Sequence, residues 1–195
     1  MKTVRHILAF AVVWSVLATP AAFAQPQFTV EEMLKLKRLS DPQLSPDGTR
    51  VAFVRTDVDL DANARPNMLV VQNLSDGRVV ISIDGATRPR WSPDGKRLAF
   101  TKVGANGEPA IWVTDLAGAP RETVAFPTGA AGHIWSPDGR WFAFVSEVFP
   151  DCAGAAGGEA ACNAGRLKEQ AASKTRARLI EGLLFRHWVS WRDGR

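Results

Sequence analysis

The stretch Trp91-Ser-Pro-Asp-Gly-Lys-Arg-Leu-Ala-Phe100 decides the fold, because two close copies of it occur in the same chain. The copies are Leu44-Ser-Pro-Asp-Gly-Thr-Arg-Val-Ala-Phe53 and Trp135-Ser-Pro-Asp-Gly-Arg-Trp-Phe-Ala-Phe144, so that Ser-Pro-Asp-Gly recurs after 47 and then 44 residues. Self-similarity at a period of about 40–50 residues, built from short strands and turns, is typical of β-propeller blades. The repeat therefore predicts an all-β fold.

Each Ser-Pro-Asp-Gly copy predicts a tight turn that joins two strands. Pro presets φ at the second turn position, Asp hydrogen-bonds to nearby backbone, and Gly adopts the left-handed conformation. A serine in such a turn has a structural role, and none of the three is expected to be a nucleophile. The predicted turn residues are Ser45, Pro46, Asp47 and Gly48, then Ser92, Pro93, Asp94 and Gly95, and finally Ser136, Pro137, Asp138 and Gly139.

The residues that follow each turn predict four strands per repeat. In Leu98-Ala99-Phe100 and its two counterparts the large apolar residues share one face, and the small alanine between them lets a neighbouring sheet approach. A second hairpin, at 68–74 and 110–116, follows the first two turns. The prediction is a partial β-propeller of about two and a half four-stranded blades. The blades start near 42, 89 and 133, and an N-terminal helix and an inserted helix accompany them.

Residues 1–24 have the pattern of a secretory signal peptide. Lys2 and Arg5 precede an apolar run of 12 residues, and Ala22-Phe-Ala24 supplies a small-residue cleavage site. The run is too short for a membrane span of about 20 residues, so cleavage is expected, with an uncleaved anchor as the alternative. The mature chain then begins at Gln25 and is exported, either periplasmic or secreted, without membrane contact.

Residues 25–40 are predicted to form the N-terminal helix. Thr29 and Glu32 make a capping box, in which the Glu32 carboxylate reaches back to the Thr29 amide. The helix is expected to end before Asp41-Pro42, because a residue before proline avoids the helical region. The incomplete propeller domain is then expected to cover residues 41–195.

Residues 147–183 are predicted to be an insertion in the third blade. Cys152 and Cys162 lie in it, and a close cysteine pair in an exported protein indicates a disulfide. A zinc site would need two further ligands nearby, and a redox pair more commonly has the spacing Cys-x-x-Cys. A helix is expected from about Arg166 to Leu183. Its many basic residues indicate a solvated face, with a site for an acidic partner as the alternative.

The chain after the insertion predicts a strand at 184–191 and then a hairpin turn at Asp193-Gly194. No returning strand follows the turn, and propellers close with typically four to eight blades. We therefore expect the chain to be the N-terminal part of a larger protein, and an isolated open array of blades to aggregate.

No residue is predicted to have a catalytic, cofactor-binding or metal-binding role. The string Gly-x-Ser-x-Gly, which a hydrolase nucleophile elbow needs, is absent from the sequence. His133 and His187 have no motif-level nucleophile beside them, and both are interpreted as structural. The net charge of +4 includes Lys2 and Arg5 of the signal peptide. Because the remaining charge forms no basic stripe or known module, nucleic acid is not an expected partner.

The repeated Trp-Ser-Pro-Asp-Gly-Lys-Arg-Leu-Ala-Phe pattern resembles the β-propeller repeats of TolB-like proteins and of the prolyl oligopeptidase family of serine peptidases. Residues 33–48, and residues 148–162 together with 184–194, look like bacterial dipeptidyl-peptidase and acylaminoacyl-peptidase homologues. The resemblance implies a propeller that covers a C-terminal α/β-hydrolase domain with a Ser-Asp-His triad. Such a propeller admits peptides and excludes folded proteins. None of the triad residues can be placed on this sequence.

The leading hypothesis is the substrate-gating propeller portion of an exported serine peptidase that hydrolyses peptides, with no activity of its own. Its expected partners are the missing C-terminal α/β-hydrolase domain and peptide substrates. The alternative is a non-enzymatic TolB-like periplasmic propeller that binds a protein partner, and a weaker third hypothesis is a standalone interaction fragment. Some exopeptidases of this family hold the substrate amine with paired glutamates from the propeller. Glu31-Glu32 is not assigned that role, because the capping box accounts for Glu32.

Overall fold

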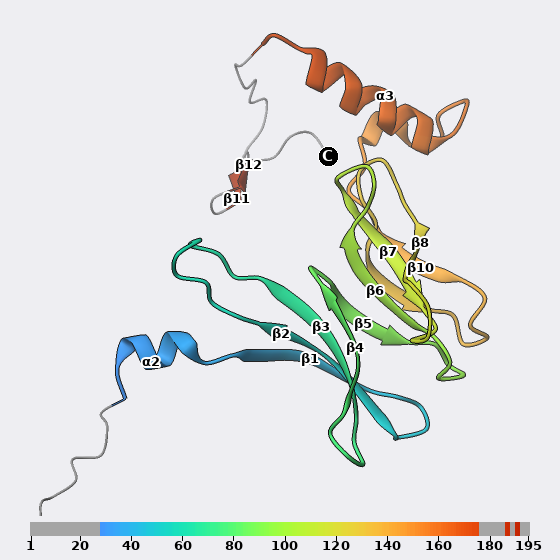
Figure 1. Ribbon diagram of the computed structural model, residues 1–195. Coiled ribbons are helices and arrows are strands. Elements are labelled where there is room, and N and C mark those ends of the chain that lie inside the picture. Colours follow the sequence, from blue (N-terminus) through green and yellow to red (C-terminus); the bar gives the residue numbers. More distant parts are fainter. Residues whose placement is uncertain (1–27, 176–185, 188–189, 192–195) are drawn as a thin grey trace, which may run out of the picture. The chain divides into compact units, whose positions relative to one another are not determined.

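The first two repeats each fold as a four-stranded antiparallel sheet in the computed structural model, which describes residues 28–175, 186–187 and 190–191 (Figure 1). Each strand pairs with the next along the chain, in the orders β1-β2-β3-β4 and β5-β6-β7-β8. The strands are β1 (Arg38–Leu44), β2 (Arg50–Thr56), β3 (Asn67–Asn73), β4 (Val79–Asp84), β5 (Thr87–Trp91), β6 (Leu98–Val103), β7 (Pro109–Thr114) and β8 (Arg121–Val124). This repeated meander is that of propeller blades, and the predicted partial β-propeller is confirmed.

The three Ser-Pro-Asp-Gly segments form the same hairpin turn in each repeat. The glycine amide donates to the serine carbonyl oxygen over 2.8 Å in the first two turns and 2.9 Å in the third. Gly48, Gly95 and Gly139 have φ of 70°, 70° and 67°, the left-handed conformation that favours glycine. Each turn joins the first two strands of its sheet, which in the third repeat are β9 (Ala131–Trp135) and β10 (Phe142–Val145).

A β-bulge interrupts the first strand of each sheet at the same place in the repeat. The residue four positions before the turn serine has a positive φ, which is 49° at Asp41, 54° at Arg88 and 64° at Gly132. The register between the first and second strands shifts across each of these positions. Because a bulge redirects side chains that would otherwise follow the pleat, it decides which residues of the first strands face the neighbouring blade.

Two apolar clusters pack the sheets against one another. The first joins the first and second sheets, and the second joins the second sheet to the β9–β10 hairpin. Ala52 and Ala99, the small residues between larger ones, are both 0% exposed. Leu98 and Phe100 belong to the first cluster and Ala99 to the second, so β6 is buried on both faces. Burying one such large side chain contributes about 1.5–3 kcal/mol.

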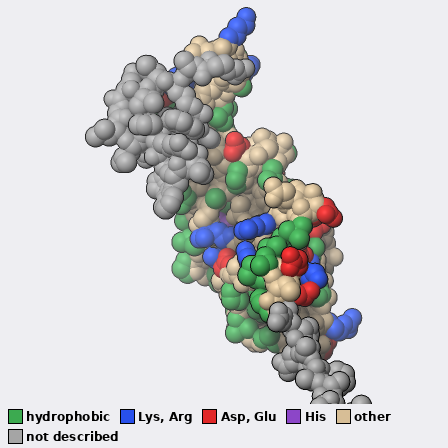
Figure 2. Space-filling model, turned by 90° about the vertical axis from the view of Figure 1, so that its left-hand side faces the viewer, with side chains coloured by type: hydrophobic (Ala, Val, Ile, Leu, Met, Phe, Trp, Pro, Cys, Tyr) green, Lys and Arg blue, Asp and Glu red, His purple; other side chains and the backbone are tan. Residues whose placement is uncertain are grey.

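The β9–β10 hairpin has an open outer face among the described residues. Ile134 and Val145 are 55% and 66% exposed, and Phe144 is 38% exposed. The predicted apolar pair Phe142 and Phe144 is therefore only partly covered. In a complete propeller the next blade covers such a face. Figure 2 shows one face of the molecule, on which hydrophobic side chains lie at the surface between charged ones.

The helix of the insertion begins and ends earlier than the sequence indicated. α3 spans Glu159–Ala172, so it begins before the predicted start at Arg166 and ends inside the predicted range 166–183, of which residues 176–183 lie outside the described residues. Gly157 and Gly158, with φ of 97° and 96°, lead into the helix, and the extended backbone of Ser173 ends it. Composition placed the helix where Ala, Lys, Glu and Arg are most frequent, and gave no signal for a start between the cysteines.

Within the single strand predicted at 184–191, the described residues form two short paired strands instead. β11 (Arg186–His187) pairs with β12 (Ser190–Trp191), Arg186 opposite Trp191 and His187 opposite Ser190. A short run of apolar and aromatic residues does not distinguish one strand from two strands joined by a turn. The turn signal at Asp193-Gly194 lies outside the described residues.

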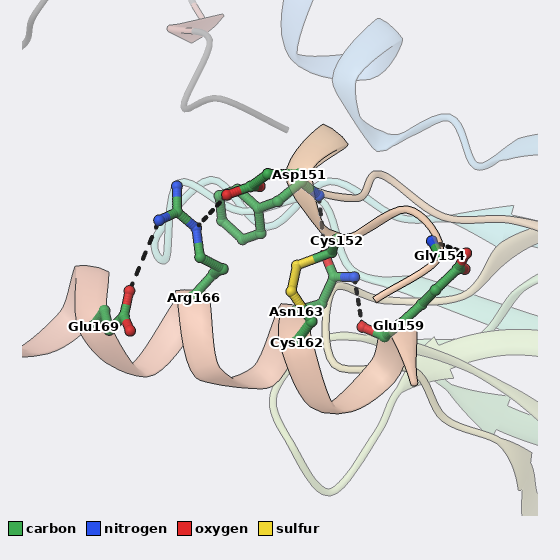
Figure 3. Close-up of a disulfide and its surroundings, with 9 residues drawn as sticks. Asp151, Cys152, Gly154, Glu159, Cys162, Asn163, Arg166 and Glu169 are labelled. Atoms are coloured by element: carbon green, nitrogen blue, oxygen red, sulfur yellow. Dashed lines mark hydrogen bonds and ion pairs between the residues drawn. A yellow bond between two sulfur atoms is a disulfide. The ribbon is translucent and has the colours of Figure 1, made fainter. Parts of the chain in front are cut away.

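The start of the insertion is held by a disulfide and by a buried asparagine (Figure 3). Cys152 ends the 3-10 turn η1 (Pro150–Cys152), and its sulfur lies 2.03 Å from that of Cys162 in α3. Asn163 Oδ1 accepts the Phe149 amide over 2.9 Å, and Nδ2 donates to the Glu159 carbonyl oxygen over 2.8 Å. The disulfide and the two hydrogen bonds of the Asn163 side-chain amide thus hold the turn η1 to the helix α3.

Residues 1–35 and 36–195 are two separate units, and the described helix of the first is shorter than predicted. α2 spans Val30–Lys35, whereas the sequence indicated a helix over 25–40. Pairing of Arg38, Leu39 and Ser40 with β2 takes the chain into β1 instead, because sheet contacts override helix propensity. The signal-peptide pattern of residues 1–24 lies outside the described residues. None of the described helices is long and apolar enough to cross a membrane.

The capping box at the start of α2 forms in part. The Glu32 amide donates to Thr29 Oγ1 over 3.2 Å, as predicted. The Glu32 carboxylate, however, pairs with Lys35 Nζ at 2.6 Å rather than with the Thr29 amide. Hydrogen bonds from its own backbone amide and from the Thr29 hydroxyl lower the pKa of Glu31.

Candidate functional site

The serines of the repeated turns are engaged in the turns themselves. The Ser92 hydroxyl lies 2.5 Å from Asp94 Oδ1 and 3.1 Å from the Arg97 carbonyl oxygen, and it accepts the Arg97 amide over 2.9 Å. The other two turns have the same serine–aspartate contact, over 2.6 and 2.5 Å. The serine hydroxyl, followed by the Lys96 amide, holds the pKa of Asp94 below its usual value. A hydroxyl held in this way has a structural role.

The first strands of the three sheets form a common wall. β1 contacts β5 and β5 contacts β9, whereas the described strands β4 and β8 do not touch each other. Sheets that converge on their first strands place those strands next to the central channel of a propeller. The polar residues of this wall are therefore the candidate site.

Two tryptophans fix the seams between the sheets along this wall. Trp91 Nε1 donates to the Gln43 carbonyl oxygen over 3.1 Å, and Trp135 Nε1 donates to the Arg90 carbonyl oxygen over 3.0 Å. The two bonds are equivalent in the repeat, since Gln43 and Arg90 each stand two positions before a turn serine. Leu44 stands where the later repeats have tryptophan, so the first repeat has no such donor.

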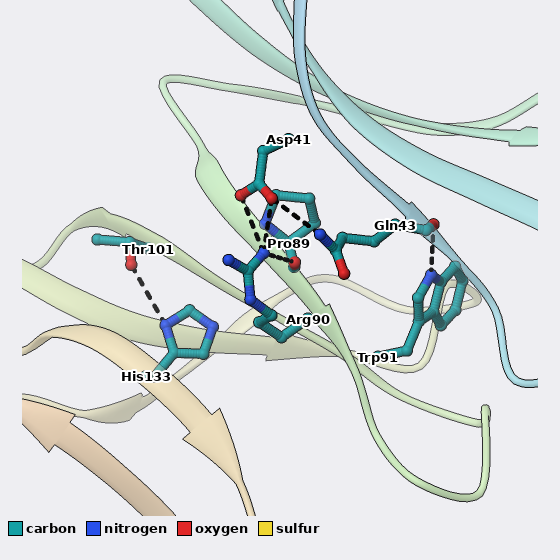
Figure 4. Close-up of polar contacts among 7 residues, drawn as sticks. All are labelled: Asp41, Gln43, Pro89, Arg90, Trp91, Thr101 and His133. Carbon is teal, nitrogen blue, oxygen red and sulfur yellow. Dashed lines mark hydrogen bonds and ion pairs between the residues drawn. The ribbon is translucent and has the colours of Figure 1, made fainter.

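An ion pair crosses the seam between the first and second sheets (Figure 4). Arg90 Nη1 lies 2.9 Å from each carboxylate oxygen of Asp41, and Gln43 Nε2 donates to Asp41 Oδ1 over 2.9 Å. The Arg90 and Asp41 side chains are 23% and 30% exposed. The bulge at Asp41 aims this carboxylate at the next blade, and the pair links β1 to β5.

His133 is a buried, neutral imidazole between the second and third sheets. It is 0% exposed, its Nδ1 lies 3.4 Å from Thr101 Oγ1, and its ring meets the edge of Phe142 at 6.1 Å between centroids. Burial is the main cause that lowers the pKa of His133 to about 4. A hydrogen bond with the Ala99 backbone raises this pKa, the charges of Arg88 and Arg90 lower it, and the charge of Asp41 raises it. No described residue is a hydrogen-bond partner of its Nε2.

Arg88 completes the group of polar side chains on the wall. It occupies the bulge of β5, as Asp41 does in β1, and it is half-buried. Its Nε is buried and has no hydrogen-bond partner among the described residues. The wall thus carries two guanidinium groups, of which one is paired.

A groove of about 570 Å³ lies between the second sheet and the β9–β10 hairpin, near the turns. The Arg97 guanidinium lies 4.8 Å over the Trp135 ring and donates to the Gly139 carbonyl oxygen over 3.0 Å. These contacts occupy Arg97 in holding one turn to the next. The groove presents no pair of groups suited to acid–base chemistry.

The sequence drew attention to His133, with a structural interpretation, but not to the arginines or the aspartate of the wall. The missed signal is visible when the first strands are aligned on their turns: Asp41-Pro-Gln-Leu, Arg88-Pro-Arg-Trp and Gly132-His-Ile-Trp. In this alignment His133 stands where the other two repeats have proline, and the charged residues occupy the positions on either side of it. Buried His133 agrees with the structural role expected for it.

The remaining residues considered from the sequence, His187, Glu31 and Glu32, are not part of the wall. The side chain of His187 lies outside the described residues. Glu31 and Glu32 belong to the unit of residues 1–35, in which the Glu32 amide donates to Thr29 Oγ1 and the Glu32 carboxylate pairs with Lys35. Within the described residues no three His, Cys, Asp or Glu side chains are grouped as metal ligands would be.

Comparison with known proteins relates the chain to peptidases that carry propellers. No protein-family model matches it. It is 30% identical over 116 residues to the uncharacterized peptidase YuxL of Bacillus subtilis, covering 57% of this chain and 18% of that protein. Acylaminoacyl peptidase of Pyrococcus horikoshii is 32% identical, with a TM-score of 0.51, over 58% of this chain and 18% of that chain. The β-propeller domain of the Trilobed protease from Pyrococcus furiosus is 33% identical, with a TM-score of 0.48, over 57% and 34%.

These matches confirm the resemblance that the repeats indicated. The chain is similar to acylaminoacyl peptidase and to the peptidase YuxL, in line with the predicted resemblance to prolyl oligopeptidase-family propellers. TolB from Acinetobacter baumannii is a weaker structural match, 28% identical with a TM-score of 0.44. The chain spans 18% of the length of YuxL and of the acylaminoacyl peptidase.

Proposed function

We propose that the chain is the substrate-gating propeller portion of an exported serine peptidase, and that an α/β-hydrolase domain elsewhere in the intact protein hydrolyses the peptides. One observation carries this proposal: the chain shares both sequence and fold with acylaminoacyl peptidase over its repeats. The described residues contain no nucleophile elbow, so the proposed contribution of this chain is access rather than chemistry.

The wall of first strands supports a gating role. A propeller surrounds a channel, and what passes through it depends on how firmly neighbouring blades hold together. Polar contacts help to hold the described seams together: each seam has one tryptophan hydrogen bond, and the first seam also has the Arg90–Asp41 pair. A peptide that fits the closed channel passes through it, whereas a bulkier polypeptide passes only if the seams between the blades open.

Gating is tested in the intact protein by comparing a tetrapeptide substrate with an unfolded polypeptide of several dozen residues. Replacing Arg90 with methionine removes the ion pair at the first seam, and hydrolysis of the long substrate is expected to rise relative to the tetrapeptide. The matched control is Arg78→Met, which removes an exposed arginine from a loop. Equal substrate ratios in the wild-type protein and both variants would contradict gating by this seam.

Export is part of the proposal and rests on two features. Residues 1–24 have the signal-peptide pattern, and Cys152 and Cys162 are joined in a disulfide, which persists in oxidising compartments. The mature protein is expected in the periplasm or the medium, with Gln25 as its first residue. N-terminal sequencing of fractionated protein checks both points, and a cytosolic product that retains Met1 would contradict export.

The alternative is a TolB-like propeller that binds a protein partner. Experiments on the same intact protein distinguish this alternative from the peptidase. Peptide hydrolysis that is abolished by a serine-directed fluorophosphonate supports the peptidase. An intact protein that hydrolyses no peptide and contains no Gly-x-Ser-x-Gly string would favour the binding propeller.

A further inference from the structure

The repeat places an ion pair between neighbouring first strands at the first seam but not at the second. Asp41, at the bulge of β1, pairs with Arg90, which stands two positions before the turn serine of the next repeat. At the second seam, Arg88 at the bulge of β5 occupies the position equivalent to Asp41. Ile134 of β9 occupies the position equivalent to Arg90. Ile134 is apolar and 55% exposed, so it supplies no charge to Arg88.

Arg88 is therefore a half-buried cation that lacks a counterion within the described part of the chain. Neither an ion pair nor a hydrogen bond of its guanidinium group occurs there, and its Nε is fully buried. Burying a charge without a partner is unfavourable, and a carboxylate is the partner that the planar guanidinium fork fits best. The position thus favours binding of an anion.

A second side chain near Arg88, His133, has one ring nitrogen without a hydrogen-bond partner among the described residues. His133 is 0% exposed, its Nδ1 faces Thr101, and its Nε2 has no partner among the residues that the structure describes. Figure 4 shows the His133 ring next to the Arg90 side chain, below the ion pair of Arg90 with Asp41. Arg88 and Arg90 both lie near enough to influence the imidazole electrostatically. Two guanidinium groups therefore lie within electrostatic range of a buried imidazole where β5 packs against β9.

The charge of this group of side chains selects the class of ligand. Arg88 and Arg90 contribute two positive charges, Asp41 contributes one negative charge, and the buried imidazole is neutral. The balance is a single positive charge, which one carboxylate neutralises and a dianionic phosphate would exceed. Since Arg90 Nη1 already holds Asp41, Arg88 is the group that is free to take the ligand.

We propose that Arg88, supported by Arg90 and His133, binds a carboxylate of a peptide at the channel wall of the second and third blades. The proposal rests on the proposed gating function, which supplies the peptide. It extends that function to a preference among peptides, for those that bring a carboxylate into the channel. The carboxylate belongs either to the peptide C-terminus or to an acidic side chain.

Three peptides test the proposal in the intact protein, with its hydrolytic serine blocked by a fluorophosphonate. The probes are N-acetyl-tetraalanine with a free C-terminus, the same peptide as its C-terminal amide, and an amidated peptide with one internal aspartate. Isothermal titration is expected to show the free-carboxylate peptide binding about tenfold more tightly than the amide, the size of one charge-assisted hydrogen bond. Tight binding of the aspartate peptide would show that the site takes a side-chain carboxylate. Weak binding of this peptide would show that the site takes the C-terminal carboxylate.

Variants of Arg88 decide whether this side chain is responsible. Arg88→Met is expected to abolish the preference for the carboxylate, Arg88→Lys to keep part of it, and the control Arg78→Met to keep all of it. Arg88→Gln serves as a second neutral variant if Arg88→Met does not fold, as judged by circular dichroism. Unchanged preference in the neutral variants overturns the proposal.

Two further outcomes separate this inference from the proposed function. If Arg88→Met lowers the melting temperature while every peptide binds as in the wild-type protein, a carboxylate of the intact protein occupies the site, and the inference fails. If the intact protein hydrolyses peptides but shows no preference for a carboxylate, the inference is overturned and the proposed gating function is unaffected. A carboxylate preference without peptide hydrolysis supports the site and contradicts the peptidase function.

Discussion

Replacing His133 with glutamine is expected to make the stability of the intact protein less dependent on pH between about 6.5 and 4. His133 is 0% exposed, and burial lowers its pKa to about 4 from the ordinary 6.5. In this interval the unfolded chain binds a proton at His133 and the folded chain does not. The free energy of unfolding of the wild-type protein therefore falls as the pH falls from 6.5 to 4.

The magnitude follows from the two pKa values. Each pKa unit corresponds to about 1.4 kcal/mol, so the lowering from 6.5 to about 4 corresponds to about 3 kcal/mol of unfolding free energy. This stability is fully present above pH 6.5 and is lost by about pH 4. Glutamine has a similar size and does not titrate, so the variant loses this contribution to the pH dependence whatever its stability at pH 7.

The assay is urea unfolding of the wild-type protein and His133→Gln at intervals from pH 7 to pH 4. The difference between their unfolding free energies is the quantity of interest, because other groups titrate equally in both proteins. Hydrogen bonds from the turns hold the pKa of Asp47, Asp94 and Asp138 below the usual value, so their own effects fall at lower pH. Parallel curves across the interval would refute the assignment of His133 as a buried neutral imidazole.

Three further predictions concern the seams, the turns and the insertion. Trp135→Phe removes the hydrogen bond from Nε1 to the Arg90 carbonyl oxygen and is expected to lower the unfolding free energy by about 1 kcal/mol, measured in urea; a neutral effect would show that the seam does not depend on this bond. Ser92→Ala leaves the Arg97 amide without its acceptor and is expected to cost about 1–3 kcal/mol, whereas the exposed control Ser75→Ala should be near neutral. Alkylation of denatured, unreduced protein should label neither Cys152 nor Cys162, and reduction should lower stability by about 3 kcal/mol; labelling of both thiols would disprove the pairing.

The parts of the fold that follow from local sequence could be predicted. The three turns were predictable because proline, aspartate and glycine act on their own backbone, and their recurrence gave the blade period. The burial of Ala52 and Ala99 also followed, since a small residue between large ones marks a close approach of sheets. These features depend on residues within about ten positions of one another.

The polar wall could not be predicted in the same way, because it depends on contacts between repeats. Asp41 and Arg90 lie far apart in sequence, and only the bulge and the packing of β1 on β5 bring them together. The helix α3 was misplaced for a similar reason. The residues that set its start, Gly157 and Gly158, carry no helical signal of their own.

The tryptophan bonds give the array of blades a direction. In both described seams the donor belongs to the later repeat and the acceptor is a carbonyl oxygen of the earlier one. A ribosome makes the acceptor first, so every new blade meets its docking point on chain that has already been synthesised. We therefore expect the propeller to assemble blade by blade from its N-terminal end during translation, rather than by collapse of the finished chain.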